Sequence, residues 1–430
     1  MPTSAQSTTP LDRQPDQPPD HAAARAIEPA CRADRAAPLA WAVLDHPGVN
    51  DHQPALLRPD LSPGRSWAAS HADPDPIGSL RTVLAGTRNA DCPPFASGWI
   101  GLIRYDVGRV LEPRAAARTA EHLPPAIELH RFDSADLQPV TPTPADAAIE
   151  TPRLALSSFP GRAAYLAACR AAIDLIRVGD VYQVNLAHCL RGSLPSSADP
   201  RAFARGIARK LFAIAQPRHG AFLDLPSGET IISLSPERFL TYDATTRRVT
   251  TRPMKGTRPT AAGAAAELDA ATKDRAELAM IVDLMRNDIG RVADFGSMAV
   301  DAPRTIETHG TVVQATATVS GTLREGLDVV DLLAATLPAG SITGAPKIRA
   351  MQIIDELEPF TRGPWCGSVV VIDDAGRLDA NVAIRTAIIR GHEFEYPVGA
   401  GIVADSNPEA EWAETLVKAS VLAPVADIVP

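Results

Sequence analysis

A lysine on a tight turn is the first residue of this sequence whose type and surroundings could do chemistry. Lys255 lies in the segment TRPMKGT, residues 251–257, between Pro253 and Gly256. The proline fixes one backbone angle and the glycine frees another, so the turn that holds the amine is tightly shaped. Such a lysine is either a solvated surface amine or, where burial or a cation such as Arg252 favours the neutral form, a nucleophile or base. The heptapeptide alone leaves both interpretations open.

Two pairs of carboxylates could hold a cation near such an amine. Asp274 and Glu277 lie three residues apart in a predicted helix, in line with its apolar stripe, where a lone carboxylate is costly. Glu411 and Glu414 repeat this spacing in a second predicted helix, and Lys418 follows one turn later. The alternative is a pair of acids stabilised by the helix dipole. Because Mg²⁺ takes one or two protein carboxylates together with water and substrate oxygens, the spacing suggests a magnesium site.

Two further charged residues stand where the charges of a ligand could meet them. Arg385 lies in the apolar run 382–387, predicted as a strand, and a guanidinium there usually pairs with a carboxylate of the protein or of a substrate. Glu237 follows a predicted strand and precedes Lys255 by 18 residues. A hairpin could bring Glu237 to Lys255, although a surface pair with Arg238 is the simpler interpretation.

Glycine-rich segments offer two places for close approach of the backbone to a ligand. Gly399, Ala400 and Gly401 could admit a ligand or merely let two strands pack. The segment PAGSITGAPK, residues 338–347, leads into a predicted helix whose start could bind an anion, and a purely structural turn is equally open. It lacks the ending of a Walker loop. Together these patterns suggest a cation-assisted site for a small polycarboxylate.

Composition narrows the class of protein and its surroundings. The 430 residues are 45% hydrophobic and 22% charged, which is typical of a globular protein with one large core or two ordinary ones. A net charge of −9 argues against nucleic acid or an anionic membrane as a partner. The five cysteines form no CxxC pair and indicate reduced thiols. With no predicted membrane span or signal segment, we expect a cytoplasmic protein.

Helical and strand patterns alternate without regular βαβ repeats. Helices are predicted for residues 162–178, 273–287, 347–356 and 408–422, and a hairpin for residues 221–225 with 230–234. Residues 1–38 are predicted to be a disordered leader rich in Pro and Ala. Residues 39–156 form a β-rich part with a strand at 98–106, and residues 157–430 form the main body. We therefore expect an α/β (α+β) fold that is not doubly wound.

Five segments, in this order, resemble the signature blocks of the chorismate-utilising enzymes. They are SPERF (235–239), PMKGT (253–257), MIVDLMRNDIGRV (280–292), GSITGAPK (340–347) and GAGIVADS (399–406). The resemblance runs from about residue 161 to 422 and is weaker around 98–109. It implies the family fold, an antiparallel β-sandwich flanked by helices, with residues 157–430 as the chorismate-binding catalytic part.

The residue before the Gly-Thr pair of the second block distinguishes the branches of this family. It is typically alanine in anthranilate and isochorismate synthases and lysine in aminodeoxychorismate synthases, and here it is Lys255. The tripeptide WCG, residues 365–367, also resembles the lysine branch. The resemblance therefore implies an enzyme that makes 4-amino-4-deoxychorismate from chorismate and ammonia, for 4-aminobenzoate and folate. The rivals are an anthranilate or isochorismate synthase and a non-catalytic paralogue that binds chorismate or a partner.

The resemblance also implies a role for each residue that matches a block. Lys255 attacks C2 of chorismate to form a covalent adduct, Glu237 protonates the leaving C4 hydroxyl, and ammonia then adds at C4. Arg385 pairs with the enolpyruvyl carboxylate. The other implied residues are Gly256, Thr257, Gly399, Ala400 and Gly401 at the substrate carboxylates, and Glu277 and Glu414, with Asp274 and Glu411 through water, at Mg²⁺.

The sequence also bears on the source of ammonia, and it departs from the family pattern at three places. No cysteine lies in a glutaminase-like context, so the resemblance implies a separate glutamine amidotransferase subunit as partner. Gln314 stands where the family often has histidine, and Thr260 stands where an arginine is common. The dipeptide at 370–371 is Val-Val where the branch usually has Gly-Tyr.

Overall fold

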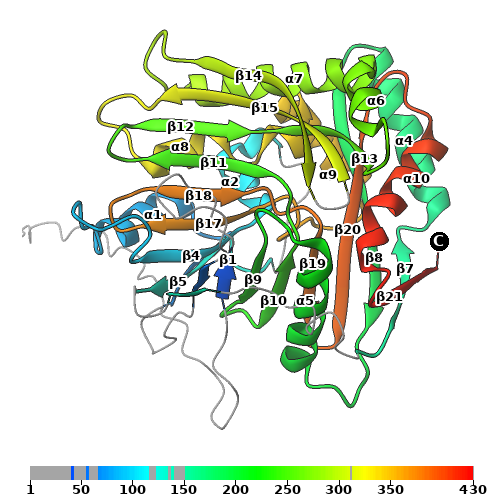
Figure 1. Cartoon of the computed structure of the whole chain (residues 1–430), viewed down its shortest axis with the longest axis horizontal. Coiled ribbons are helices and arrows are strands. Elements are labelled where there is room, and N and C mark those ends of the chain that lie inside the picture. The colour runs from blue at the N-terminus through cyan, green and yellow to red at the C-terminus, as the bar shows by residue number, and fades with distance from the viewer. Residues whose placement is uncertain are drawn as a thin grey trace, which may run out of the picture.

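The strands of this computed structural model form two large sheets that face each other (Figure 1). The structure describes residues 40–42, 55–57, 66–115, 123–133, 137–139, 151–309 and 312–429. The predicted leader at 1–38 lies outside these residues. Within them, neighbouring strands pair antiparallel except β21 with β7. The predicted antiparallel β-sandwich flanked by helices is therefore confirmed.

The first sheet has 11 strands among the described residues, and the second has 10. In spatial order, the first contains β21 (Ala426–Val429), β7 (Leu154–Phe159), β8 (Gln183–Ser193), β20 (Glu393–Ile402), β19 (Thr386–Arg390), β10 (Glu229–Ser233), β9 (Ala221–Asp224), β1 (Ala40–Ala42), β2 (Ala55–Leu57) and β6 (Leu137–Pro139), with β16 (Gly344–Ala345) beside β8. The second contains β13 (Met254–Pro259), β15 (Val312–Thr322), β12 (Arg248–Arg252), β11 (Arg238–Asp243), β18 (Leu378–Asn381), β17 (Ser368–Asp373), β4 (Gly98–Ile103), β5 (Ile127–Phe132) and β3 (Ser66–Ala69), with β14 (Ala299–His309) beside β15.

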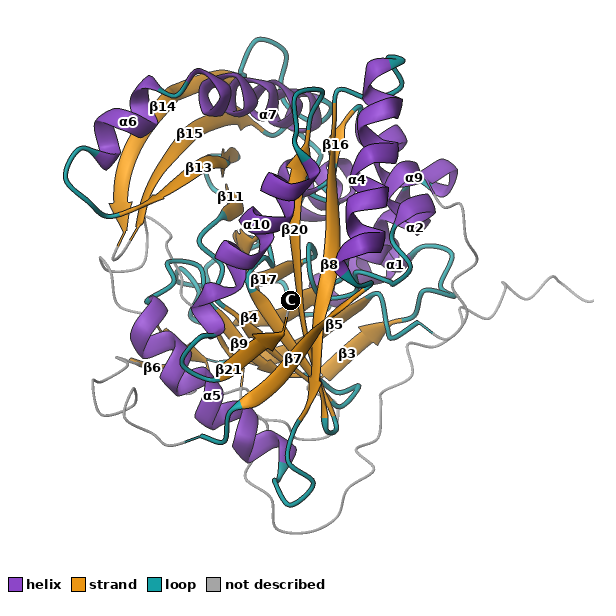
Figure 2. Cartoon of the chain, turned by 90° about the vertical axis from the view of Figure 1, so that its right-hand side faces the viewer, coloured by secondary structure: helices purple, strands orange, loops and turns teal. Residues whose placement is uncertain are grey.

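Helices cover the outer faces of both sheets. They are α1 (Pro76–Ala85), α2 (Gly108–Leu111), α4 (Arg162–Arg177), α5 (Pro200–Ala215), α6 (Ala264–Ala270), α7 (Thr272–Gly290), α8 (Val329–Thr336), α9 (Lys347–Leu357) and α10 (Pro408–Ala419), with 3₁₀ turns η1 (Tyr105–Val107), η2 (Pro113–Ala115), η4 (Gly340–Ile342) and η5 (Ser420–Leu422). In Figure 2, α6 and α7 lie along the outer side of β13, β14 and β15, while α10 lies beside β20.

The largest core cluster contains side chains from both sheets and from α8. Leu223 of β9 and Ile388 of β19 come from the first sheet, and Ile100 of β4 and Val370 of β17 come from the second; all four are at most 1% exposed. Each such side chain contributes about 1.5–3 kcal/mol by leaving water. Separate apolar clusters seat α5 against the first sheet, α4 and α9 against β8 and β20, and α6 and α7 against β13 and β15.

Strands from both predicted parts of the chain share each sheet. β4, from the 39–156 part, pairs with β17 in the second sheet, and β1 pairs with β9 in the first. The predicted boundary between residues 156 and 157 falls inside β7. The β-rich part and the catalytic part are thus joined by continuous hydrogen-bonded sheets.

The four long helices and the hairpin of β9 and β10 are confirmed. Two strand predictions are corrected. The strand predicted for 98–106 ends at Ile103 and passes into the 3₁₀ turn η1. Arg385, predicted within a strand, lies instead in a bend before β19 with φ of +50°.

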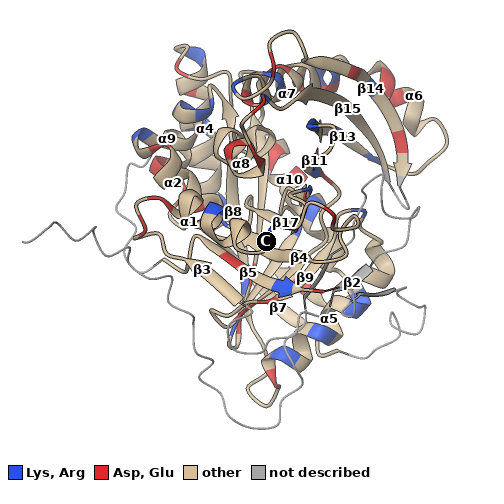
Figure 3. Ribbon diagram, turned by 90° about the vertical axis from the view of Figure 1, so that its left-hand side faces the viewer, with Lys and Arg blue, Asp and Glu red and all other residues tan. Residues whose placement is uncertain are grey.

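Charged residues of both signs are spread over the fold: in Figure 3, α5 carries blue segments of Arg and Lys, and α6 carries red segments of Asp and Glu. Among the described residues, no helix combines the length and apolarity needed to cross a membrane. The described cysteines are buried and unpaired, as predicted, and are Cys92, Cys169, Cys189 and Cys366.

Candidate active site

Lys255 stands where a bulge interrupts the pairing of β13 with β15. The register shifts between Lys255 and Thr257, and Gly256 between them adopts φ of +74°. A Cβ at this position would lie 2.7 Å from Leu268 Cδ1 and 2.9 Å from Asp274 Cγ. Only glycine meets both the backbone angle and the close packing, so this bulge requires Gly256 between Lys255 and Thr257.

The amine of Lys255 lies inside the molecule. Its side chain is 15% exposed, and Nζ lies 3.8 Å from Glu277 Oε2 of α7. Nζ is also 3.3 Å from the point where a Cβ on Gly401 of β20 would lie. Arg252, considered from the sequence as a neighbouring cation, forms an ion pair with Glu307. The surface interpretation of Lys255 is therefore excluded.

Glu237 and Arg385 are held by two loops that are hydrogen bonded to each other. The hydroxyl of Ser235 donates to the carbonyl of Val382 at 2.6 Å, and the N–H of Val382 donates to the carbonyl of Glu237 at 3.1 Å. The N–H of Leu234 donates to the carbonyl of Arg385 at 3.0 Å. These bonds join the loop after β10 to the loop after β18 and so bring together two residues far apart in sequence.

The carboxyl group of Glu237 is suited to proton donation. Burial raises its pKa to about 7, while the nearby Ser341 hydroxyl and the charges of Lys255 and Arg385 act in the opposite direction. A carboxyl group that titrates near neutrality can both keep and release a proton there, as general acid catalysis requires. The opposing charges also show that Glu237, Lys255 and Arg385 share one environment, so Glu237 is not the surface partner of Arg238 that the sequence left as the simpler interpretation.

Arg385 has an unusual lack of protein partners. Among the residues that the structure describes, its guanidinium forms no ion pair and no hydrogen bond. Burial lowers its pKa, and Tyr396 and Glu237 oppose that shift. An enclosed guanidinium without a carboxylate is costly, so this group is arranged to receive an anion from a ligand.

Buried polar atoms without hydrogen bonds surround these charged groups. In the described part of the chain they include both amide atoms of Gln183, Oδ1 of Asn185, the Ser341 hydroxyl, which makes no regular hydrogen bond, and the Tyr396 hydroxyl. Most buried polar atoms in proteins are paired, so such a group marks a place for a ligand. The sequence analysis missed these residues. The signal was the alternation of Gln183 and Asn185 with apolar neighbours on β8.

The glycines of β20 face these polar atoms. A Cβ on Gly401 would lie 2.9 Å from Gln183 Nε2, and one on Gly399 would lie 2.6 Å from Asn185 Oδ1. The methyl of Ala400 belongs to the core cluster behind the strand. The two glycines therefore let Gln183 and Asn185 pack closely against β20 on the Lys255 side, whereas Ala400 offers that side only its backbone.

Carboxylates from α7 and α10 meet around lysine side chains. Lys273 Nζ lies 3.8 Å from Glu277 Oε1 and 3.9 Å from Glu411 Oε1. Glu414 pairs with Lys418 at 2.7 Å, and Lys418 also donates to the backbone of β20. No group of three or more His, Cys, Asp or Glu side chains in the described residues is arranged to hold a metal ion. Ammonium groups stand between the acids instead.

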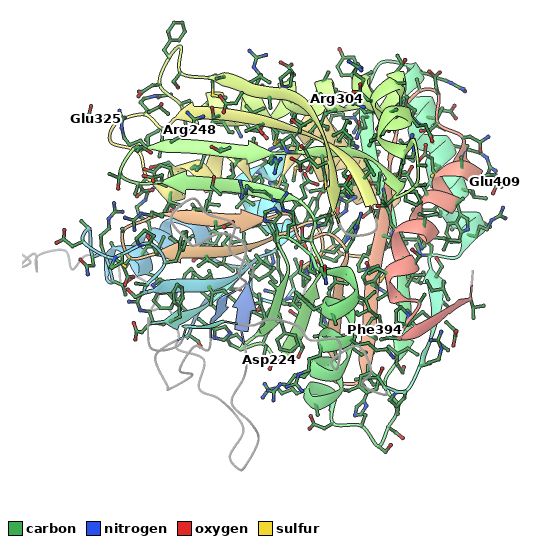
Figure 4. All side chains as sticks on the ribbon, in the orientation of Figure 1. Asp224, Arg248, Arg304, Glu325, Phe394 and Glu409 are labelled. Atoms are coloured by element: carbon green, nitrogen blue, oxygen red, sulfur yellow. The ribbon has the colours of Figure 1, made fainter. Side chains whose placement is uncertain are left out.

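Asp274 is placed differently from the other three predicted metal ligands. It forms an ion pair with Arg258 at 2.9 Å, beside the Gly256 bulge. Glu411 accepts a hydrogen bond from Ser406 at 2.6 Å. Figure 4 labels Glu409, two residues earlier on α10, at the outer edge of the molecule, where it pairs with Arg162. Of these acids on α10, Glu411 is buried, whereas Glu409 and Glu414 are both more than half exposed.

The charge on α10 acids depends on their neighbours. Burial raises the pKa of Glu411; Ser406 opposes this shift and the charge of Glu414 adds to it. Desolvation alone would raise the pKa of Glu414. Lys418, and after it Lys255 and Lys273, outweigh this effect, so the pKa of Glu414 is lowered. Lysine side chains thus balance the charges of Glu277, Glu411 and Glu414, and Arg258 balances that of Asp274.

An aromatic and hydroxyl cluster anchors α10 against β8. The ring of His188 stacks on Trp412 with centroids 4.4 Å apart and meets Tyr165 edge-on at 5.2 Å. The two ring nitrogens of His188 bond to the hydroxyls of Ser158 and Thr415, each at 2.8 Å. Because Thr415 follows Glu414 directly, this cluster sets the position of the α10 carboxylates.

The three departures from the family pattern have distinct surroundings. Gln314 is buried and donates to the Thr257 hydroxyl at 3.4 Å, so it supports the bulge beside Lys255. Val370 and Val371 pack in the main core. Thr260 is exposed just after β13. Of the three, Gln314 contacts a candidate site residue.

The family is established by a match to the model for chorismate binding enzymes over residues 61–424. The chain belongs to this family. It is 37% identical to aminodeoxychorismate synthase component 1 of Salmonella typhimurium over 375 residues, covering 80% of this chain and 81% of that protein. It is also 37% identical to anthranilate synthase component 1 of Thermus thermophilus over 390 residues, covering 81% and 82%.

A solved structure agrees with this assignment. Anthranilate synthase component I from Streptococcus pneumoniae superposes with a TM-score of 0.71 at 26% identity, covering 88% of this chain and 93% of that one. The protein is therefore a chorismate-utilising enzyme. Because relatives of two specificities are equally similar, the reaction has to be argued from the site.

Proposed function

We propose that this enzyme converts chorismate and ammonia to 4-amino-4-deoxychorismate through a covalent adduct with Lys255. The observation that carries the proposal is the enclosed amine of Lys255, which lies 3.3 Å from where a Cβ on Gly401 would stand and in the same environment as Glu237. A primary amine beside the buried amide of Gln183, which has no hydrogen-bond partner among the described residues, can act as a nucleophile on a bound ligand.

The reaction consists of two displacements that together exchange the C4 hydroxyl for an amino group. The neutral amine of Lys255 bonds to C2, the ring double bonds shift, and the C4–O bond breaks. Glu237 gives its proton to the departing hydroxyl, which leaves as water. Ammonia then bonds to C4, the double bonds shift back, and the C2–N bond to Lys255 breaks. The two steps direct nitrogen to C4.

The remaining site residues would bind and orient the substrate. Arg385 would pair with the enolpyruvyl carboxylate, since its guanidinium has no acid partner among the described residues. Backbone groups of Gly256, Thr257, Gly399 and Gly401 would approach the ring carboxylate. In this proposal Glu277, Glu411 and Glu414 would hold Mg²⁺, which when bound would neutralise that carboxylate and polarise the conjugated ring.

Ammonia would come from glutamine through a separate amidotransferase subunit. The relatives named above are each called component 1, which supports a partner component. We accordingly place the enzyme in the formation of 4-aminobenzoate and folate in the cytoplasm. Adding free ammonium in place of the partner allows the synthase to be tested alone.

Product identification tests this proposal directly. The purified protein is incubated with chorismate, Mg²⁺ and ammonium, and the product is separated by chromatography and identified by mass. We expect 4-amino-4-deoxychorismate. Anthranilate would instead assign the activity of the Thermus relative, and isochorismate would assign an isomerisation in which water enters at C2 as the C4 hydroxyl leaves.

A second experiment tests the covalent step. Lys255→Ala should lower kcat by about a hundredfold or more, because the variant lacks the amine that forms the covalent adduct. Intact-protein mass spectrometry of wild type with chorismate but without ammonium should show an adduct that Lys255→Ala lacks. An unaltered rate in the variant would refute covalent catalysis.

A further inference from the structure

A buried ion pair that the proposed reaction does not use joins α7 to α9. Nζ of Lys347, the first residue of α9, lies 2.6 Å from Oδ2 of Asp288, near the end of α7. The two side chains are 10% and 6% exposed. A cation is disfavoured at the start of a helix and an anion at its end, so neither charge stabilises its own helix. The two residues are therefore positioned for each other.

The amine of Lys347 also closes a loop. It donates to the carbonyl of Thr336 at 2.9 Å, at the end of α8, and so joins the two ends of the segment 337–346. The last carbonyls of a helix lack partners within the helix, and a cation is favoured there. One amine thus fixes both ends of this loop and attaches them to Asp288 of α7.

The loop brings Ser341 to the carboxyl group of Glu237. Its 3₁₀ turn η4 packs so closely on α7 that a Cβ on Gly340 would lie 2.5 Å from Cε of Met285. Ser341 follows directly and is buried, and its hydroxyl favours the charged form of Glu237. The contact between this hydroxyl and Glu237 therefore depends on how firmly the loop is held against α7.

We propose that Lys347 is a positioning residue for the reaction: by tying the loop 337–346 to Asp288, it keeps the Ser341 hydroxyl beside Glu237. This inference rests on the proposed function, in which Glu237 gives its proton to the leaving hydroxyl. A buried ion pair is seldom worth more to stability than a well-packed apolar pair, whereas its hydrogen bonds fix a direction and a length. Lys347 therefore contributes to the rate through the geometry of the loop.

A double-mutant cycle tests whether Lys347 acts through Ser341. Consumption of chorismate is measured, under the conditions of the product assay, for wild type, Lys347→Met, Ser341→Ala and the combined variant. We expect kcat to fall about tenfold in each single variant with KM changed less than about threefold, and the combined variant to be no slower than the slower single one. Additive losses, or an unaltered kcat in Lys347→Met, would overturn the inference.

The pH profile of kcat gives a second readout. Because the Ser341 hydroxyl favours the charged carboxylate of Glu237, removing or displacing it should move the alkaline limb about 0.5–1 unit to higher pH. Ser341→Ala and Lys347→Met should share this shift. The other described titratable or charged groups that face Glu237 remain in both variants; they are Lys255, Arg385 and Cys366. An unmoved limb in Lys347→Met would contradict the proposed role.

Two further variants separate positioning from loss of structure. Asp288→Leu combined with Lys347→Met replaces the pair by apolar side chains and leaves no buried charge, so Tm should stay near that of wild type while kcat remains about tenfold low. Arg349→Met removes an exposed ion pair of α9, between Arg349 and Asp180 at 2.8 Å, and should leave kcat unchanged. Recovery of kcat in the apolar combination, or an equal loss in Arg349→Met, would refute positioning by Lys347.

The outcomes also distinguish this inference from the proposed function. If wild type forms anthranilate, only the proposed product is wrong, because the rate of chorismate consumption still judges Lys347. If wild type consumes no chorismate, the proposed function fails and this inference fails with it. If wild type forms 4-amino-4-deoxychorismate and the losses in the cycle are additive, the proposed function holds and the role of Lys347 is wrong.

Discussion

Two enclosed guanidinium groups of this enzyme have opposite surroundings. Arg362 donates to both oxygens of Glu358 at 2.9 and 2.6 Å, and to the carbonyls of Ile342 and Asn185 at 2.9 and 2.8 Å. The guanidinium of Arg385, in contrast, has no ion pair or hydrogen bond among the described residues. The first group is satisfied by the protein, and the second is left for something that the protein does not supply.

The difference separates the frame of the site from its binding surface. Arg362 also lies over the rings of Tyr105 and Trp365, at 4.8 and 5.0 Å from their centroids. A fully paired network rigidifies its surroundings, here the backbone on either side of Ser341 and at Asn185. An unpaired group costs stability and is retained where a ligand completes it. The number of unmet hydrogen bonds thus distinguishes positioning residues from binding residues.

The largest effect is expected when the hydrogen-bonded network of Arg362 is disrupted. Arg362→Leu should lower the free energy of unfolding by about 3–5 kcal/mol, because Glu358 remains buried without its counter-charge. Urea unfolding followed by circular dichroism measures this loss. Arg349→Leu is a matched control, since Arg349 forms an exposed pair with Asp180 and should cost less than about 1 kcal/mol. Similar losses in the two variants would contradict the distinction.

The next largest effect is expected on catalysis, when Glu237 of the candidate active site is replaced. Glu237→Gln keeps the shape of the side chain but cannot give up a proton, so kcat should fall by about 10²–10³. Steady-state assays with ammonium and chorismate measure it. If kcat falls less than threefold while KM rises, Glu237 binds substrate and does not donate the proton.

The same residue makes stability depend on pH. Burial raises the pKa of Glu237 in the folded protein from an ordinary 4.5 to about 7, so its contribution to stability is complete below pH 4.5 and is lost as pH rises through 7. The loss amounts to about 3 kcal/mol. Glu237→Gln should therefore be more stable than wild type at pH 8 and show no such difference at pH 4.5. Urea unfolding at both pH values decides this, and parallel profiles would refute the pKa shift.

The smallest effect sharpens the comparison at Arg385. Arg385→Gln should lower kcat/KM for chorismate by about 10- to 100-fold, because the substrate loses one charge-assisted hydrogen bond. The free energy of unfolding should stay the same or rise slightly, because an unpaired guanidinium is removed. A loss of stability comparable to that of Arg362→Leu would show that Arg385 has a structural partner.

Much of the fold could be predicted because its signals are local. The helix at Pro408–Ala419 begins with a proline in its first turn, and Asn407 caps it through bonds to the next backbone N–H groups. Apolar spacing predicted α4 and α7 within a few residues. The strand assigned around Arg385 was wrong, because the bend there depends on a hydrogen bond to Leu234, which is distant in the sequence.

The sequence by itself determined the family, the helices and the identity of the charged residues, because these depend on residue types at fixed spacing. It also placed Lys255 beside Gly256, whose positive φ the bulge requires. Only the tertiary structure decided that Glu237 shares a buried environment with Lys255, that Arg385 is unpaired, and that Lys273 lies between two acids. Burial and unmet hydrogen bonds are properties of packed neighbours, and those neighbours come from strands and helices far apart along the chain.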